Sequence, residues 1–282
     1  MNPRPPIPPE IKREVRRRCG FGCVICGLPI YEYEHMLEWA EVQRHVAEEI
    51  TLLCRQHHGE KTNRLLPKDN VVAADKDPYN KRIGVSTNYL LHYSGSDVKL
   101  SMGGSRFSYE GMVDGFTFAP LVVDGFASIL FRREQGRLFL TFFAHDELNK
   151  PVVSIVDNEI VYDTGQWDAE WVGQSLTIRE SHRKILLKMT FNPPGEIKIE
   201  KGRILRNGIE ILISDNYFFI TNNSNFIAGV KAANCPVGIS IGDPRPDCGA
   251  GYCISSVPRY LFDRKKARQF LRACLSQNRK KL

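Results

Sequence analysis

Short apolar runs dominate most of the chain. From about Val85 to Val257 they are rich in β-branched and aromatic residues, as in ASILFRR, RLFLTFF, KILLKMTF and NYFFIT. Dipeptides typical of tight turns, DG, QG, DN and NG, separate these runs, as does PPG. This pattern predicts a mostly antiparallel β domain, either a sandwich or a barrel-like sheet.

The chain before this region has a different pattern. The stretch from Pro9, PEIKREVRRRCG, predicts a short basic helix, with prolines at its start and Gly20 at its end. Residues 23–62 predict a hairpin followed by a helix: an aromatic-rich strand after the turn at Cys26-Gly27, a second strand in EITLLC, and a helix from RQHHGEKTNRLL. Two strands and a helix would form a complete small unit.

A boundary follows this unit. Residues 67–84, PKDNVVAADKDPYNKRIG, lack clear periodicity and are rich in turn formers, so we expect a linker there. The expected fold class is therefore α+β with two domains, residues 1–84 and residues 85–282.

Basic residues are concentrated at the C-terminus. The chain has a net charge of +7, and the last 25 residues carry 9 basic side chains and 1 acidic one. The sequence DRKKARQFLRACLSQNRKKL predicts an amphipathic basic helix with Asp263 as its N-cap. This helix could hold DNA, or it could pack on the β domain or a protein partner.

Composition and the N-terminus indicate a soluble protein. No apolar run approaches the ~20 residues that a membrane span needs, so we expect no membrane association. The first 18 residues are rich in prolines and arginines where a signal peptide would have an apolar core, which predicts a cytoplasmic protein. In a reducing compartment, the cluster of cysteines near the N-terminus is better suited to a metal than to disulfides.

Four residues have the spacing of a structural zinc site. Cys23 and Cys26 form one pair with a two-residue gap, and Cys54 and His57 form another. Zinc favours tetrahedral thiolate and imidazole ligands, and residues at i and i+3 share a helix face, so the second pair can close a site begun by the first. The alternative, four buried core residues, does not explain why both pairs share the same gap.

A second histidine needs a different role. His58 follows His57 directly, and adjacent helical residues point about 100° apart, so the two imidazoles cannot serve the same metal. Lys61 lies three residues after His58 on the same predicted helix face and could reach a phosphate.

Together these residues resemble a known family. The pattern C-x-x-C, then E-H-M, then I-x-L-L-C-x-x-H-H-x-x-K-T is similar to the zinc-stapled branch of the HNH endonucleases, whose ββα-metal fold cuts nucleic acid. The resemblance covers residues 11–66. It implies structural Zn²⁺ and a catalytic divalent cation, Mg²⁺ or Mn²⁺.

The resemblance also assigns roles. His35 matches the general base that deprotonates the attacking water, Glu34 stands where the family usually has an Asp metal ligand, and His58 matches the last ligand of the same cation. The zinc ligands are Cys23, Cys26, Cys54 and His57. An imidazole suits proton transfer near neutrality, and a hard cation relieves charge on the leaving oxygen.

The family's central Asn falls at Glu49. A carboxylate there could orient the loop or bind the cation directly, so Glu49 is a further candidate ligand, or it could leave the site weakened. His45, in the same loop, could approach the site or be an exposed loop histidine. Three later cysteines could form a second metal site, but their spacing matches no zinc template and favours buried thiols: Cys235, Cys248 and Cys253.

Seven basic residues near these motifs could form a track for DNA phosphates. They are Lys12, Arg13, Arg16, Arg17, Arg55, Lys61 and Arg64. Such contacts position a backbone without reading bases; a solvated charged helix face is the alternative.

The expected function is a metal-dependent DNA endonuclease, nicking or cutting both strands. The layout resembles HNH effectors of bacterial anti-phage defence, including those of Zorya type, and modification-dependent restriction enzymes, with the β domain recognising a target, a partner or an activating signal. The competing interpretation is a non-catalytic zinc module that binds DNA or protein.

Overall fold

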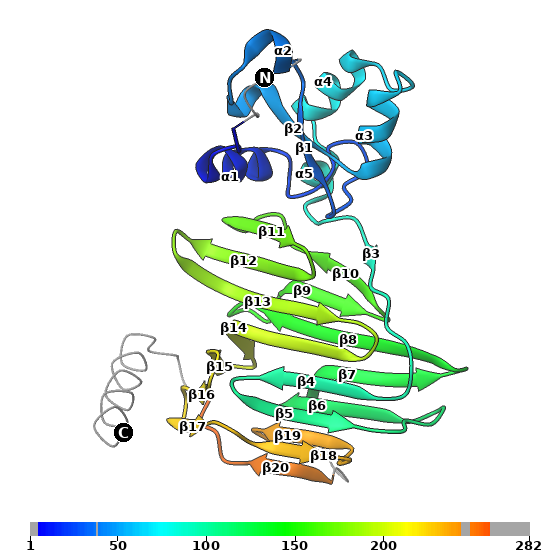
Figure 1. Cartoon of the computed structure of the whole chain (residues 1–282). Helices are drawn as coiled ribbons and strands as arrows, with labels where there is room; N and C mark the ends of the chain where they lie inside the picture. Colours follow the sequence, from blue (N-terminus) through cyan, green and yellow to red (C-terminus); the bar gives the residue numbers. More distant parts are fainter. Residues whose placement is uncertain (1–4, 38, 244–248, 260–282) are drawn as a thin grey trace. The chain divides into compact units, whose positions relative to one another are not determined.

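The chain divides into two compact units. The computed structural model describes residues 5–37, 39–243 and 249–259, and the units are drawn in Figure 1. The first unit combines residues 1–89 with 161–184, and the second combines 90–160 with 185–282. The sequence places everything after residue 84 in one domain, whereas in the structure residues 161–184 belong with the N-terminal segment.

The N-terminal segment contains the predicted hairpin and helices. Its elements are α1 Pro9–Arg18, β1 Glu32–His35, α2 Trp39–Val42, a 3₁₀ turn at Ala47–Glu49, β2 Ile50–Leu53, α3 Arg55–Thr62, α4 Lys68–Lys76 and α5 Tyr79–Ile83. Strands β1 and β2 are antiparallel, with Glu34 opposite Thr51 and His35 opposite Ile50. The basic helix, the two strands and the following helix are therefore present as predicted.

The predicted linker is instead helical, because each of its two prolines begins a helix. Pro67 and Pro78 are the N-cap residues of α4 and α5, where their fixed φ suits a helix start. Helix α4 buries Val71 in the core that also holds Val15, Ile50 and Leu52. The segment is part of the first unit's packing.

Residues 161–184 are joined to the N-terminal segment of the first unit by backbone and side-chain hydrogen bonds. Val85 and Asp163 form an isolated antiparallel bridge, and the hydroxyl of Tyr162 donates to the carbonyl of Phe21 over 2.8 Å. Its two strands, β11 Asp168–Val172 and β12 Ser175–Ser181, form an antiparallel hairpin.

The second unit is built from strands. They are β4 Val98–Met102, β5 Ser105–Tyr109, β6 Thr117–Val123, β7 Phe126–Glu134, β8 Arg137–His145, β9 Pro151–Val156, β13 Lys184–Asn192, β14 Glu196–Arg206, β15 Ile209–Ile213, β16 Phe218–Ile220, β17 Asn225–Ile227, β18 Lys231–Ala233, β19 Val237–Ile241 and β20 Ala250–Ile254. Two short strands, β3 Tyr89–Leu90 and β10 Glu159–Tyr162, lie where the chain passes between the units.

Two sets of strands make up this unit. One runs β20-β19-β6-β7-β8-β9 and the other includes β13-β14-β15-β16-β17; Figure 1 shows β6, β7 and β8 as long neighbouring strands. The sets contact each other through β8 and β14. Buried aromatic side chains, among them the stacked pair Phe118 and Phe131, form the core.

The sheets are mixed rather than purely antiparallel. Most neighbours are antiparallel hairpins, but β4 is parallel to β14 and β19 is parallel to both β6 and β20. The predicted turns hold: Asp124 and Gly125 both have positive φ between β6 and β7, as do Asn207 and Gly208 between β14 and β15. The fold class is α+β, and the predicted C-terminal helix lies outside the described residues.

Candidate metal centre and neighbouring ionisable groups

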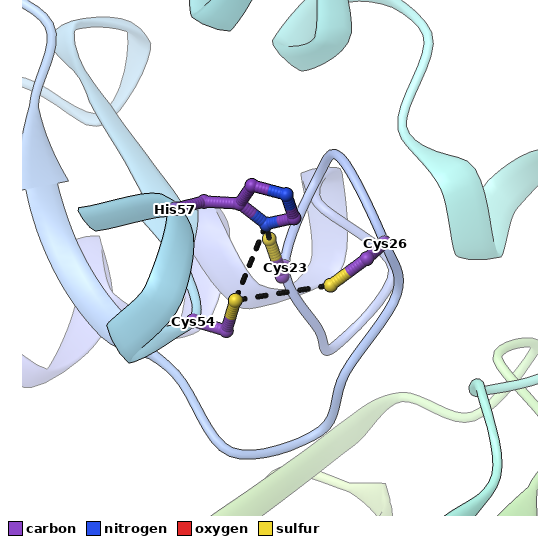
Figure 2. A group of neighbouring side chains, drawn as sticks. All are labelled: Cys23, Cys26, Cys54 and His57. Atoms are coloured by element: carbon purple, nitrogen blue, oxygen red, sulfur yellow. Dashed lines mark hydrogen bonds between the residues drawn. The ribbon is translucent and has the colours of Figure 1, made fainter. Parts of the chain in front are cut away.

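Four side chains converge on one point in the first unit. Cys23, Cys26, Cys54 and His57 each offer a ligand atom within 4.8 Å of the others. Figure 2 shows the three sulfurs and the imidazole turned toward one another. Nδ1 of His57 is 3.3 Å from Sγ of Cys23 and 3.2 Å from Sγ of Cys54, and the sulfurs of Cys26 and Cys54 are 3.8 Å apart.

These distances fit a tetrahedral zinc site. With Zn–S near 2.3 Å and Zn–N near 2.0–2.1 Å, a tetrahedron places two sulfurs about 3.8 Å apart and a sulfur and a nitrogen about 3.5 Å apart. A disulfide would need sulfurs about 2.05 Å apart, and the cysteines are free. The chain therefore has a Cys₃His cluster that could hold a zinc ion.

Hydrogen bonds prepare the cluster for a cation. The hydrogen bond from the Cys26 thiol lowers the pKa of Cys23, despite the opposing effect of burial, and the backbone N–H groups of Cys26 and Ile25 lower it further. The same bond and burial raise the pKa of Cys26, since that thiol is the donor. One thiolate is thus favoured before a metal adds its own charge.

Helix α5, in the segment expected to be a linker, supports the turn that carries Cys23 and Cys26. Asn80 of α5 is fully buried, and its Nδ2 donates to the carbonyls of Gly20 and Gly27 at 3.0 and 2.9 Å. The hydroxyl of Thr87 donates to the carbonyl of Cys26 at 2.7 Å. Gly27 has φ +75°, and a Cβ there would lie 2.1 Å from Oδ1 of Asn80. The turn therefore requires glycine at this position, and sequence reasoning missed Asn80 because its partners lie 53 and 60 residues away.

Glu34 and His58 lie side by side. Nε2 of His58 is 2.8 Å from Oε2 of Glu34, and Nζ of Lys61 is 2.5 Å from Oε1 of the same carboxylate. Glu32, two residues earlier on the same face of β1, is 3.6 Å from both Arg55 and His58. One face of α3, with basic residues at every third position, thus lies against the face of β1 that carries Glu32 and Glu34.

His35 lies in a different group. Its side chain is buried, with Nε2 3.2 Å from Nδ1 of His45, and its ring packs edge-on against Trp39. Glu49, at the position of the family's Asn, accepts hydrogen bonds from Nε and Nη2 of Arg44, one on each carboxylate oxygen. That contact lowers the pKa of Glu49.

The candidate cation ligands do not form a three-residue cluster. Within residues 5–37, 39–243 and 249–259, the zinc cluster is the one group of three or more Cys, His, Asp or Glu side chains with converging ligand atoms. Glu34 and His58 are therefore a pair, and Glu49 is not their third member. His45, by contrast, lies beside His35, which agrees with the expectation that it could approach the site rather than be an exposed loop histidine.

One of the seven basic residues predicted to contact DNA phosphates is buried. Arg16 is 4% exposed and binds Asp168, Glu170 and the hydroxyl of Tyr33, so it is a structural residue rather than a surface contact. Burial alone would lower its pKa, but the hydrogen bond to Asp168 raises it well above the usual range.

The other six basic residues differ in exposure. Arg17, Arg55 and Arg64 are exposed, whereas Lys12, Arg13 and Lys61 are partly buried. Of the three later cysteines, Cys235 is partly buried and Cys253 is exposed, so neither is the buried thiol expected, and Cys248 lies outside the described residues.

No protein-family model, curated protein or solved structure matches the chain. In the part of the chain that the structure describes, none of the helices has both the length and the apolar character to cross a membrane. The α+β architecture and the Cys₃His cluster are therefore the features that bear on function.

Proposed function

We propose that the chain is a metal-dependent DNA endonuclease of the ββα-metal type, stapled by zinc. One observation supports this most strongly. Consecutive residues of α3 have separate partners: His57 turns toward the three cysteines, while His58 lies 2.8 Å from Glu34 on β1. A structural metal on one side and a carboxylate–imidazole pair on the other is the arrangement that the family resemblance implies.

Glu34 and His58 are the proposed ligands of the catalytic cation. Mg²⁺ keeps several waters and needs few protein ligands, and Mn²⁺ accepts imidazole more readily. Such a cation would supply Lewis acidity at the leaving oxygen. Lys61, now bound to Glu34, is placed to turn to a phosphate oxygen once that carboxylate has another partner.

His35 is the proposed base, and its neighbours set its tautomer. Nε2 of His45 is 2.9 Å from the carbonyl of Pro5, which can only accept, so this nitrogen carries the proton. Nδ1 of a neutral His45 then accepts from Nε2 of His35. Nδ1 of His35 is therefore the nitrogen with the lone pair that receives a proton from water.

Plasmid nicking tests the proposal. Supercoiled DNA is incubated with the full chain and Mg²⁺ or Mn²⁺, and the rates of His35→Ala and Glu34→Gln are compared with wild type. Loss of a general base or a cation ligand should slow cleavage by about 100-fold or more. His92→Ala, an exposed histidine of the second unit, is the matched control and should cleave normally. Equal rates for wild type and His35→Ala, with equal zinc contents, would remove His35 from the mechanism.

A non-catalytic zinc module is the second candidate. The observation in its favour is that both oxygens of Glu34 already have partners, as part of a row of ion pairs between β1 and α3. Such a row could simply hold the helix on the strand. DNA binding without cleavage, with every cation tried, would favour this function.

Regulation is the proposed role of the second unit. A nuclease that contacts mainly phosphates has little sequence preference and would endanger its own cell. We propose that the β-rich unit, as in anti-phage defence effectors of similar layout, directs or restrains cleavage through a target or a protein partner. This rests on architectural analogy.

A further inference from the structure

The first unit contains a cavity that the proposed cleavage does not use. It has a volume of about 380 Å³, within the range of small-ligand sites, and is lined by residues of α1 and of the β11–β12 hairpin with its flanks. Its described lining includes no zinc ligand and none of Glu34, His35 and His58. All of the lining residues belong to this one unit.

Positive charge exceeds negative charge around the cavity. Five of its lining side chains are Lys or Arg and two are acidic. The two acids, Asp168 and Glu170, are bound by Arg16 and Arg179 at distances from 2.8 to 3.5 Å. Among the residues that the structure describes, the remaining three cations, Lys12, Arg13 and Arg183, form no ion pair with a carboxylate. The cavity therefore favours an anion.

An indole ring lies beside these cations. The guanidinium carbon of Arg13 is 4.8 Å from the centre of the Trp167 ring, and the imidazole of His182 meets that ring edge-on at 6.2 Å. Arg–aromatic stacks with further cations nearby are the surfaces on which proteins bind nucleobases and their phosphates. A purely anionic ligand such as an acidic peptide would need the cations but not the indole.

We propose that this cavity binds a nucleotide, with the base against Trp167 and the phosphate against Lys12, Arg13 and Arg183. The nucleotide could be free or part of a single strand, since both present the same chemistry. This site goes beyond the proposed cleavage and does not depend on it. Binding can therefore be measured without Mg²⁺ or Mn²⁺, and His35→Ala should bind like wild type.

Calorimetry with three probes tests the site: dAMP, inorganic phosphate and a short oligodeoxyadenylate. Arg183→Glu should weaken binding of dAMP and the oligonucleotide by about tenfold or more, because it removes a phosphate contact and adds repulsion. Lys68→Glu, at the exposed start of α4, changes the net charge equally and should weaken binding by less than about twofold. Similar losses from both variants would overturn the proposal.

Trp167 variants separate base recognition from simple anion binding. Trp167→Leu should weaken the binding of dAMP by about tenfold and leave the affinity for inorganic phosphate unchanged. Trp167→Phe should retain most of the affinity for dAMP because it keeps a stacking ring. The unfolding midpoint and zinc content of each variant show that it is folded. Two results would overturn the proposed site. One is that phosphate binds as tightly as dAMP and Trp167→Leu has no effect; the other is that none of the probes binds. An oligonucleotide that binds more tightly than dAMP identifies a strand-borne ligand, and equal affinities identify a free nucleotide.

Discussion

Arg16 and Asp168 form a buried two-pronged pair although 152 residues separate them in the sequence. Nε and Nη2 of the guanidinium donate to the two carboxylate oxygens at 2.9 and 2.8 Å, and both side chains are nearly inaccessible to water. The same guanidinium reaches Glu170 and Tyr33. This contact fastens α1 to β11 within the first unit.

Arg16→Met should therefore destabilise the first unit by about 3–5 kcal/mol, because it leaves the buried carboxylate of Asp168 with Arg179 as its remaining cation. Urea unfolding followed by circular dichroism measures the change. Arg17→Met, on the exposed side of the same helix, should stay within about 0.5 kcal/mol of wild type. Equal stability of the two variants would contradict a structural role for Arg16.

Zinc removal should unfold the region around the Cys₃His cluster. The wild-type chain should contain one zinc by mass spectrometry of metals, and Cys54→Ser should lose it. Apparent binding free energies of about 10–16 kcal/mol for structural zinc are largely folding free energy, so a chelator should abolish the first unit's unfolding transition. Cys253→Ser, at an exposed cysteine of the second unit, should retain zinc. Full zinc content in Cys54→Ser would exclude this ligand set.

Asn80→Ala should weaken the turn that carries the first ligand pair. It removes two hydrogen bonds and leaves the carbonyls of Gly20 and Gly27 without their donor, a loss of about 2–4 kcal/mol. Thermal unfolding and the rate of zinc loss to a chelator should both report it. Asn70→Ala, on the exposed side of α4, is the matched change and should have little effect. A wild-type rate of zinc loss in Asn80→Ala would show that Asn80 does not stabilise the metal centre.

The second unit should lose stability as the pH falls. Burial, and then the charge of Arg206, lower the pKa of His145 below its usual value, while a backbone hydrogen bond with Leu205 and the charge of Asp146 oppose them. Between the lowered pKa and the ordinary 6.5, the unfolded chain binds more protons than the folded one, so stability rises with pH across this window and is lost below it. Urea midpoints at several pH values should show this slope, and His145→Gln should flatten it. His92→Gln should leave it unchanged.

Local patterns predict much of the fold. Alternating apolar runs and turn dipeptides locate the strands of the second unit, and the two Cys and Cys/His pairs locate the metal cluster, because these signals depend on neighbouring residues. The prolines of 67–84 are misleading, since the same residue that breaks a helix interior favours its first turn.

Long-range contacts are what the sequence could not show. Arg16 is predicted as a surface cation because arginine is rarely buried, and nothing near it reveals a partner 152 residues away. The return of 161–184 and the cavity beside Trp167 depend on the same kind of contact. For Glu34 and His58, by contrast, the resemblance to a family brings together residues that periodicity alone leaves apart.

The discontinuity of the first unit sets an order of events during synthesis. Arg16 leaves the ribosome 152 residues before Asp168, and at about 5–20 residues per second this delay is roughly 8 to 30 s. The cysteine and histidine ligands emerge early in this interval, whereas the hairpin that neutralises Arg16 emerges only after residues 90–160 of the second unit. The four residues that could hold zinc are thus all synthesised long before Asp168, the buried partner of the N-terminal helix, becomes available.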